Sequence, residues 1–153
     1  MSAPSRGRRL GVDVGKVRVG VAISDPDGIL ATPLVTLSRD MGAAADSVPA
    51  DIAELSRLMR EHEVVQVVVG LPVRLNGAEG AAAIDIRAYS ERLADAVTPV
   101  PVVLADERMS TVVATRRLAE RGVRGKRQRA VVDQAAAVEI LQGWLDAQRR
   151  QTR

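Results

Sequence analysis

The chain has 153 residues and a formal net charge of +3, with one tyrosine, one tryptophan, no phenylalanine and no cysteine. This length suits one domain with its own hydrophobic core, and the lack of cysteine excludes disulfides, thiolate catalysis and zinc–thiolate sites. The scarcity of aromatic residues argues against recognition of nucleic acids by base stacking. With no apolar leader and no apolar run of membrane-spanning length, we expect a soluble, cytoplasmic protein that does not bind membranes.

Residues 10–25, LGVDVGKVRVGVAISD, predict a β-hairpin, because apolar side chains alternate with small or polar ones along both halves. Gly15-Lys16 is a plausible turn, since glycine readily adopts a positive φ. Asp13 lies in the middle of a face made largely of glycine. Glycines on one strand face suggest close approach of a backbone or a ligand, and a carboxylate there needs a cation, a metal or hydrogen bonds.

The rest of the chain predicts alternating strands and helices. A third strand is expected over residues 29–37, at a sheet edge because it contains Pro33. A helix over 47–61 then precedes an apolar strand over 64–69. After a loop with Gly and Pro, the capping-box spacing of Asn76 and Glu79 predicts a helix to about residue 96.

The last third of the chain predicts a strand over 100–105, a helix from Ser110 or Thr111 to Gly122, a basic loop, and a final helix over 129–148. That helix has an apolar stripe with Asp133 on its flank; the stripe is formed by Val131, Ala135, Val138, Leu141 and Leu145. The order βββαβαβαα predicts an α/β fold with a mixed five-stranded sheet, three antiparallel strands plus two parallel, and helices on both faces. We expect a single domain over 1–153 in which residues 1–8 and 147–153 are flexible basic tails.

Three acidic positions stand out from this pattern: Asp13, the pair Asp106-Glu107 at the end of a central strand, and Asp133. If the final helix packs on the glycine face of the hairpin, Asp133 comes close to Asp13. An all-oxygen cluster suits Mg²⁺ or Mn²⁺, and one or two such ions can support phosphodiester hydrolysis. Basic runs are usually solvated surface. The run over residues 116–129 therefore indicates a nucleic acid partner only because it accompanies such carboxylates.

Four segments resemble the signature blocks of the bacterial YqgF family: LGVDVGKVRVGVAISD, VVVGLPVRLNGAEG, VVLADERMSTVVA and VVDQAAAVEILQGWLD. They occur in order from residue 10 to about residue 146. Members are described as Holliday junction resolvases or pre-16S rRNA nucleases with a ribonuclease H-like fold. The resemblance implies a metal-dependent nuclease whose acids are Asp13, Glu107 and Asp133, with Asp106 retained as an additional metal ligand to be tested.

The same resemblance places Arg108 and Ser110 where they can orient the acids or contact a phosphate, and it places the loop containing Asn76 beside the substrate cleft. The full set of expected substrate contacts is Lys16, Arg18, Asn76, Arg108, Ser110, Arg124, Lys126 and Arg127. The cations among them would track a phosphate backbone.

The favoured function is maturation of the 5′ end of pre-16S rRNA, on free RNA or a ribosomal particle, by a monomer or a homodimer. The first alternative is resolution of branched DNA, which requires a dimer to cut two strands symmetrically. A second alternative is a non-catalytic RNA-binding ribosome-assembly factor. An actin-like ATPase is disfavoured, because such proteins close two domains on a nucleotide and this chain supplies one.

Overall fold

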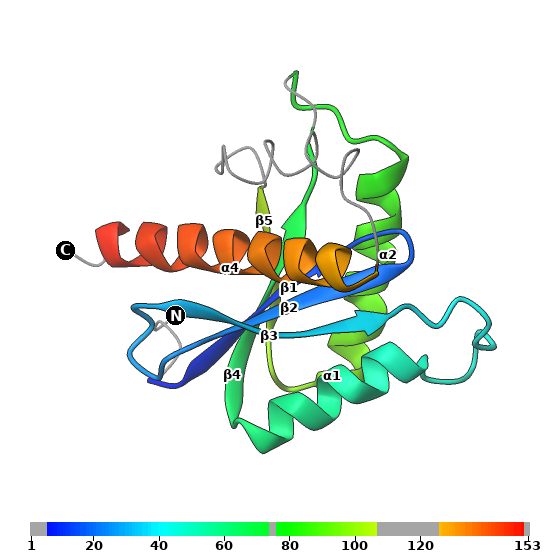
Figure 1. Ribbon diagram of the computed structural model, residues 1–153, viewed down its shortest axis with the longest axis horizontal. Coiled ribbons are helices and arrows are strands. Elements are labelled where there is room, and N and C mark those ends of the chain that lie inside the picture. Colours follow the sequence, from blue (N-terminus) through cyan, green and yellow to red (C-terminus); the bar gives the residue numbers. More distant parts are fainter. Residues whose placement is uncertain (1–5, 74–75, 107–125, 152–153) are drawn as a thin grey trace.

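The computed structural model describes residues 6–73, 76–106 and 126–151, with side chains excepted for 126–130. Its five strands form one mixed sheet in the order β3-β2-β1-β4-β5 (Figure 1). The strands are β1 (Arg8–Val14), β2 (Arg18–Ser24), β3 (Ala31–Ser38), β4 (Val64–Leu71) and β5 (Val102–Asp106). The first three pair antiparallel, while β4 pairs parallel with β1 and β5 parallel with β4. The predicted sheet is confirmed, with β1 at its centre.

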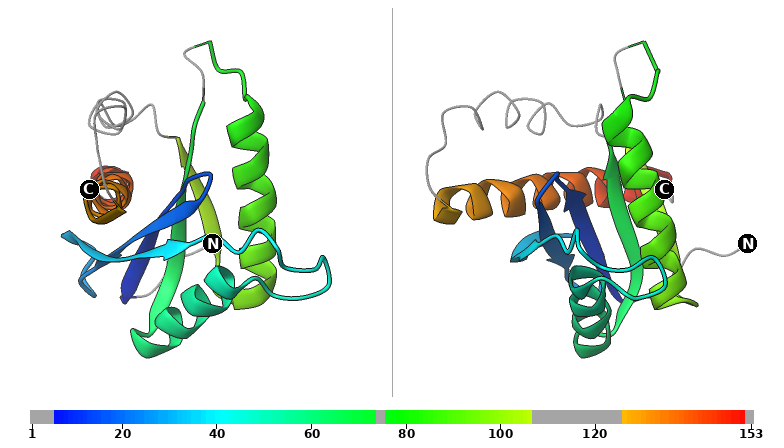
Figure 2. Two further views of the ribbon diagram at one scale, coloured as in Figure 1. Left: turned by 45° about the vertical axis from the view of Figure 1, so that its right-hand side comes forward. Right: turned by 90° about the vertical axis from the view of Figure 1, so that its right-hand side faces the viewer.

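The described helices cover both faces of this sheet, and each face has its own hydrophobic core. They are α1 (Ala50–Glu61), α2 (Ala81–Val97) and α4 (Lys126–Gln151). Figure 2 shows α4 on one face and α1 with α2 on the other. The larger core lies under α1 and α2 and includes Ile52 and Leu55 of α1, whereas α4 covers a smaller, alanine-rich core. None of the described helices combines the length and apolar character needed to cross a membrane.

Strand β3 lies at the sheet edge, as Pro33 predicted. Val21 pairs with Val35 and the next residue, Ala22, pairs with Pro33, so Leu34 is the extra residue of a β-bulge. A proline cannot donate to a neighbouring strand, and an edge position with a bulge accommodates that loss.

The ends of α4 differ from the prediction. The helix begins at Lys126, so residues 126–128 are helical rather than part of a basic loop, and it continues to Gln151 rather than ending near 148. At the other end of the chain, Arg8 belongs to β1 and the Gly7 N–H donates to the Pro26 carbonyl. Of the expected tails, Arg8 therefore belongs to β1 and residues 147–151 belong to α4.

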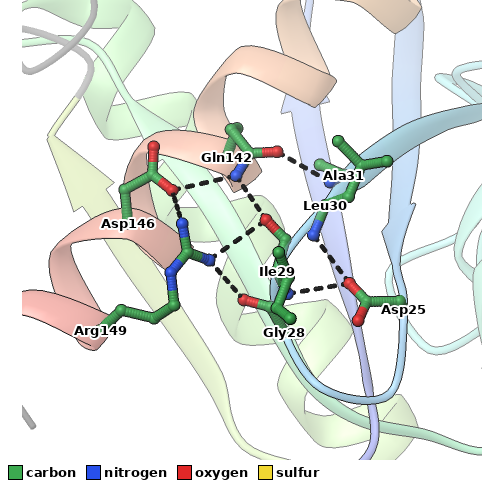
Figure 3. Close-up of polar contacts among 8 residues, drawn as sticks. All are labelled: Asp25, Gly28, Ile29, Leu30, Ala31, Gln142, Asp146 and Arg149. Carbon is green, nitrogen blue, oxygen red and sulfur yellow. Dashed lines mark hydrogen bonds and ion pairs between the residues drawn. The ribbon is translucent and has the colours of Figure 1, made fainter.

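The C-terminal half of α4 is held by the β2–β3 turn (Figure 3). The Gln142 amide donates to the Ile29 carbonyl and accepts from the Ala31 N–H, both at 2.8 Å. Arg149 Nη1 donates to the Gly28 carbonyl at 2.8 Å. These bonds satisfy main-chain groups that the turn itself leaves unpaired, which explains why the helix extends past the predicted end.

Two local predictions about turns and caps are wrong. The N-cap of α2 is Gly80, not Asn76; the Asn76 side chain accepts from the Ala78 N–H, and Glu79 pairs with Arg87. In the hairpin turn, Gly15 is not among the positive-φ glycines. Glycine is needed at position 15 for space instead, because a Cβ there would lie 2.9 Å from the Arg18 carbonyl oxygen.

A buried polar contact joins α1 to α2. The Tyr89 hydroxyl donates to Asp51 Oδ2 at 2.7 Å, and both residues are buried. The pKa of Tyr89 is raised well above the ordinary value of 10.0. Burial is the largest cause, and the hydrogen bond to Asp51 is the second. The contact therefore favours the neutral phenol in the folded chain.

Because the folded pKa of Tyr89 exceeds the unfolded one, its contribution to stability is complete below about pH 10 and declines as the pH rises further. We expect the phenolate absorbance band of this single tyrosine to appear only together with unfolding in an alkaline titration. Tyr89→Phe should remove that alkaline loss of stability. A phenolate that forms near pH 10 while circular dichroism remains native would contradict the prediction.

Candidate active site

Asp13 lies near the C-terminal end of the central strand and is only 4% exposed. Its cross-strand partner on β2 is Gly20, and the preceding residue, Val12, pairs with Val69 of β4. Strands pair with β1 on both sides here, and this pairing fixes the position of the Asp13 backbone from which the carboxylate side chain extends. Asp13 shares its face with Gly11, which lies two residues earlier.

This glycine-lined face is where α4 packs against the sheet. A Cβ at Gly11 would lie 2.6 Å from Leu141 Cβ, and a Cβ at Gly20 would lie 2.1 Å from the main-chain oxygen of Asp133. Real side chains essentially never approach that closely, so helix and sheet meet here only because both positions are glycine. The expected packing of the last helix on the glycine face is thus observed.

The contact at Gly20 brings two carboxylates into neighbouring positions. Gly20 lies directly opposite Asp13, and cross-strand partners have Cβ positions about 5 Å apart. The residue of α4 that touches Gly20 is Asp133, which is itself buried. Two of the three predicted acids, one on β1 and one on α4, therefore lie near each other on the glycine-lined face, with Gly20 next to both.

Asp133 belongs to the buried stripe of α4, not to its flank. The buried residues of this helix include Asp133, Ala136, Ala137, Ile140 and Leu141, whereas Val131 is 61% exposed. The prediction is wrong here because it followed apolar character alone. Ala137 follows Asp133 by four residues and so lies directly below it on the same helix face.

Arg18 binds Asp133 directly. Its Nε donates to Asp133 Oδ2 at 2.7 Å, with the Arg18 side chain 27% exposed and that of Asp133 9% exposed. Arg18 therefore holds one oxygen of the candidate carboxylate, and its contact with a phosphate stays a prediction. An ion pair this shielded from water orients the carboxylate more firmly than a surface pair does.

Lys16 and Asn76 lie in exposed turns. Lys16 is exposed within the β1–β2 turn, three residues after Asp13, and no ion pair or hydrogen bond of its side chain occurs among the described residues. Asn76 is exposed at the turn before α2, with its side-chain oxygen bound to the Ala78 N–H. The exposure of both residues is compatible with the expected substrate contacts.

The remaining predicted residues lie partly or wholly outside the described part of the chain. Lys126 and Arg127 open α4 without described side chains. Four further residues lie outside the described part of the chain: Glu107, Arg108, Ser110 and Arg124. Within residues 6–73, 76–106 and 131–151, no three acidic or histidine side chains gather as a metal site. The described part supplies a carboxylate pair, and the predicted third acid, Glu107, lies beyond it.

Asp106 ends β5 on the opposite face from Asp13. Val102 and Leu104 pack into the core under α1 and α2, while Val103 and Ala105 pack under α4. Since side chains alternate along a strand, Asp106 belongs with Val102 and Leu104. This register disfavours Asp106 as a metal ligand alongside Asp13.

We accordingly expect Asp106→Asn to change the rate of nucleic acid cleavage by no more than about threefold, as for a substitution outside the reacting groups. The measurement is single-turnover cleavage, with divalent-metal affinity determined in parallel by calorimetry. A loss as large as that caused by Asp13→Asn, together with weaker metal binding, would instead assign Asp106 to the site.

One contact near the site was not anticipated from the sequence. Arg39, just after β3, donates from Nη1 to the carbonyl of Gly15 at 3.0 Å, across the β1–β2 turn. No periodicity marks such a residue, because it follows the end of a strand and its partners are distant in the sequence. The only local signal is an arginine next to an aspartate, Asp40, in the loop before a helix.

Comparison with known proteins covers nearly the whole chain. Residues 7–147 match the family model RuvX, described as Holliday junction resolvase. The chain belongs to the RuvX family. This membership confirms the resemblance of the four sequence blocks to the YqgF family, because RuvX and YqgF are two names for one family.

Curated relatives share about half of their residues with this RuvX protein. One from Nocardia farcinica, named "Putative pre-16S rRNA nuclease", is 54% identical over 143 residues, covering 94% of this chain and 79% of the relative. Relatives of the same name from Rhodococcus erythropolis and Mycolicibacterium smegmatis are each 53% identical. The former alignment covers 96% of this chain and 82% of the relative, and the latter 95% and 84%.

Among solved structures, Thermus thermophilus RuvC in complex with a Holliday junction substrate resembles this chain with a TM-score of 0.55. The sequences are 16% identical, and the match covers 95% of this chain and 97% of RuvC, so it shows a common fold. RuvX family membership and the nuclease names of the relatives identify this chain as an enzyme that hydrolyses phosphodiester bonds.

Proposed function

We propose that this chain is a divalent-metal-dependent endonuclease that matures the 5′ end of pre-16S rRNA, with Asp13, Glu107 and Asp133 as its acids. The observation that supports the proposal is that Asp13 and Asp133, both buried, adjoin Gly20 where α4 packs on the hairpin. A buried carboxylate pair is costly to form, so such a pair is typical of a functional site.

The donor chemistry of this place fits Mg²⁺ or Mn²⁺. Carboxylate oxygens are the ligands that hard divalent ions prefer, and the described acids supply them without histidine or cysteine. Asp13 and Asp133 would hold one or two ions, with Glu107 as the third ligand. A bound divalent ion supplies activation of water and stabilisation of charge on the phosphate and leaving oxygens.

The other side chains have separate roles in the proposal. Strand pairing positions Asp13, and Arg18 holds Asp133 Oδ2 so that the second oxygen keeps a defined direction. Lys16 and Asn76, which are both exposed, would contact the substrate backbone. Arg108 and Ser110 would act on the acids or a phosphate, and Arg124, Lys126 and Arg127 would follow the strand at the start of α4.

The substrate preference rests on the names of the relatives, which specify pre-16S rRNA. Such an enzyme can act as a monomer, on free RNA or on a ribosomal particle. The family description favours a second candidate, resolution of a DNA four-way junction, which requires a homodimer. The two candidates share the acids and differ in substrate and oligomeric state.

The test presents a labelled 5′-extended 16S precursor fragment and a labelled four-way DNA junction to the protein, with Mg²⁺, Mn²⁺ or EDTA. We expect metal-dependent cleavage of the RNA, and light scattering should report the oligomer that performs it. Cleavage of the junction alone by a dimer would establish the second candidate. Equal cleavage with EDTA would overturn the metal-dependent mechanism.

A further inference from the structure

The β1–β2 turn carries Lys16, three residues after Asp13 in the chain. Residues 15–17 are exposed, and the Gly15 N–H donates to the Arg18 carbonyl at 2.8 Å, which closes the turn. Asp13 precedes this turn, and Arg18, the partner of Asp133, follows it. The conformation of the turn therefore decides where the Lys16 ammonium lies relative to the two carboxylates.

Arg39 donates two hydrogen bonds to this turn. Its main-chain N–H donates to the Val17 carbonyl at 2.9 Å, and its Nη1 donates to the Gly15 carbonyl at 3.0 Å. These are the carbonyls on either side of Lys16. A single residue thus holds the backbone before and after the lysine.

The guanidinium of Arg39 is itself fixed by α2. Its two terminal nitrogens bind the two oxygens of Asp85 at 2.7 and 3.2 Å, and its side chain is only 10% exposed. The guanidinium carbon also lies 5.2 Å from the centre of the Tyr89 ring, and Tyr89 is held in turn by Asp51 of α1. A bidentate pair combined with a cation–π contact restrains an arginine much more than one surface ion pair does.

We propose that Arg39 is a positioning residue that fixes the β1–β2 turn so that Lys16 meets a phosphate of the nucleic acid substrate. The inference rests on the proposed function for the identity of that substrate. A lysine on a preformed turn loses less conformational freedom on binding, which increases affinity without any new contact. Asp13 is held independently by its strand partners, so Arg39 acts on substrate affinity more than on the chemical step.

A double-mutant cycle separates positioning from a general structural role. Affinity for a labelled RNA is measured by fluorescence anisotropy for four proteins that all carry Asp13→Asn, which prevents cleavage: the parent, Lys16→Ala, Arg39→Met and the double variant. We expect Arg39→Met alone to weaken binding about 3- to 10-fold, and to have almost no further effect once Lys16 is alanine. An equal loss in both backgrounds would overturn the proposal.

Arg57→Met is the matched control, because it also removes an arginine held by two ion-pair contacts, here to Glu54 and Glu61 of α1. It should leave RNA affinity within about twofold. If Arg39→Met does not fold, Asp85→Asn removes the anchor instead, and its effect should likewise vanish in the Lys16→Ala background. An Asp85→Asn effect that ignores Lys16 would overturn the proposal.

A readout that needs no substrate keeps this inference separable from the proposed function. Hydrogen exchange of peptides spanning residues 14–18 should accelerate in Arg39→Met and remain at the parent rate in Arg57→Met. If Arg39→Met speeds exchange but the protein binds no RNA, then Arg39 does fix the turn and the proposed substrate is wrong. Unchanged exchange of the turn in Arg39→Met would overturn the proposal that Arg39 fixes the turn.

Discussion

We expect Asp13→Asn to lower the rate of phosphodiester cleavage by at least about 1,000-fold, because under the proposed function Asp13 holds a metal ion and its loss removes several kcal/mol of transition-state stabilisation. Asparagine has nearly the same shape and is buried in the same strand pairing, so the variant should remain folded. The measurement is the single-turnover rate at saturating metal, with unfolding monitored by circular dichroism.

The control for this variant is Asp95→Asn, which removes an exposed carboxylate of α2 on the opposite face of the sheet. It should cleave at the parental rate. Calorimetry should show weaker binding of Mn²⁺ to Asp13→Asn than to the control. A fully active Asp13→Asn protein would exclude Asp13 from the chemistry, whatever the substrate.

Gly20→Ala destabilises the protein by about 3 kcal/mol and lowers activity about 100-fold, although it adds a single methyl group. The added carbon would lie 2.1 Å from the main-chain oxygen of Asp133, so α4 must move away from the sheet. That movement displaces Asp133 from Asp13 and disturbs the Arg18 ion pair. Urea denaturation and cleavage rates measure the two effects.

Gly143→Ala provides the matched comparison on the same helix. Position 143 is exposed, and a Cβ there meets nothing within 4 Å. Because alanine is the better helix former, this change should stabilise the protein by about 0.5–1 kcal/mol with activity unchanged. Equal effects at positions 20 and 143 would show that close packing does not explain the role of Gly20.

Features with a short-range signal were predictable from the sequence. Alternation over residues 10–25 predicted the hairpin, Pro33 predicted the edge strand, and the glycines on the Asp13 face predicted the closely packed partner. In each case one residue type has a steric or hydrogen-bonding requirement that few positions in a fold can meet.

Contacts made by long polar side chains were not predictable in the same way. Arg18 reaches Asp133, Arg39 reaches Asp85, and Arg149 reaches the β2–β3 turn, all across large sequence separations. An arginine has several rotatable bonds and no periodic pattern, so its partner depends on the completed fold. The same dependence explains why Asp133, read as a flanking residue, lies within the buried stripe of α4.

The origin of the carboxylate pair has a consequence for the newly made chain. Among the described elements, Asp13 belongs to the first to be synthesised, β1, and Asp133 to the last, α4. Domains fold as units once enough of the chain has emerged during translation. A nascent chain that lacks α4 therefore lacks Asp133, and under the proposed function it cannot cleave nucleic acid before α4 has been synthesised.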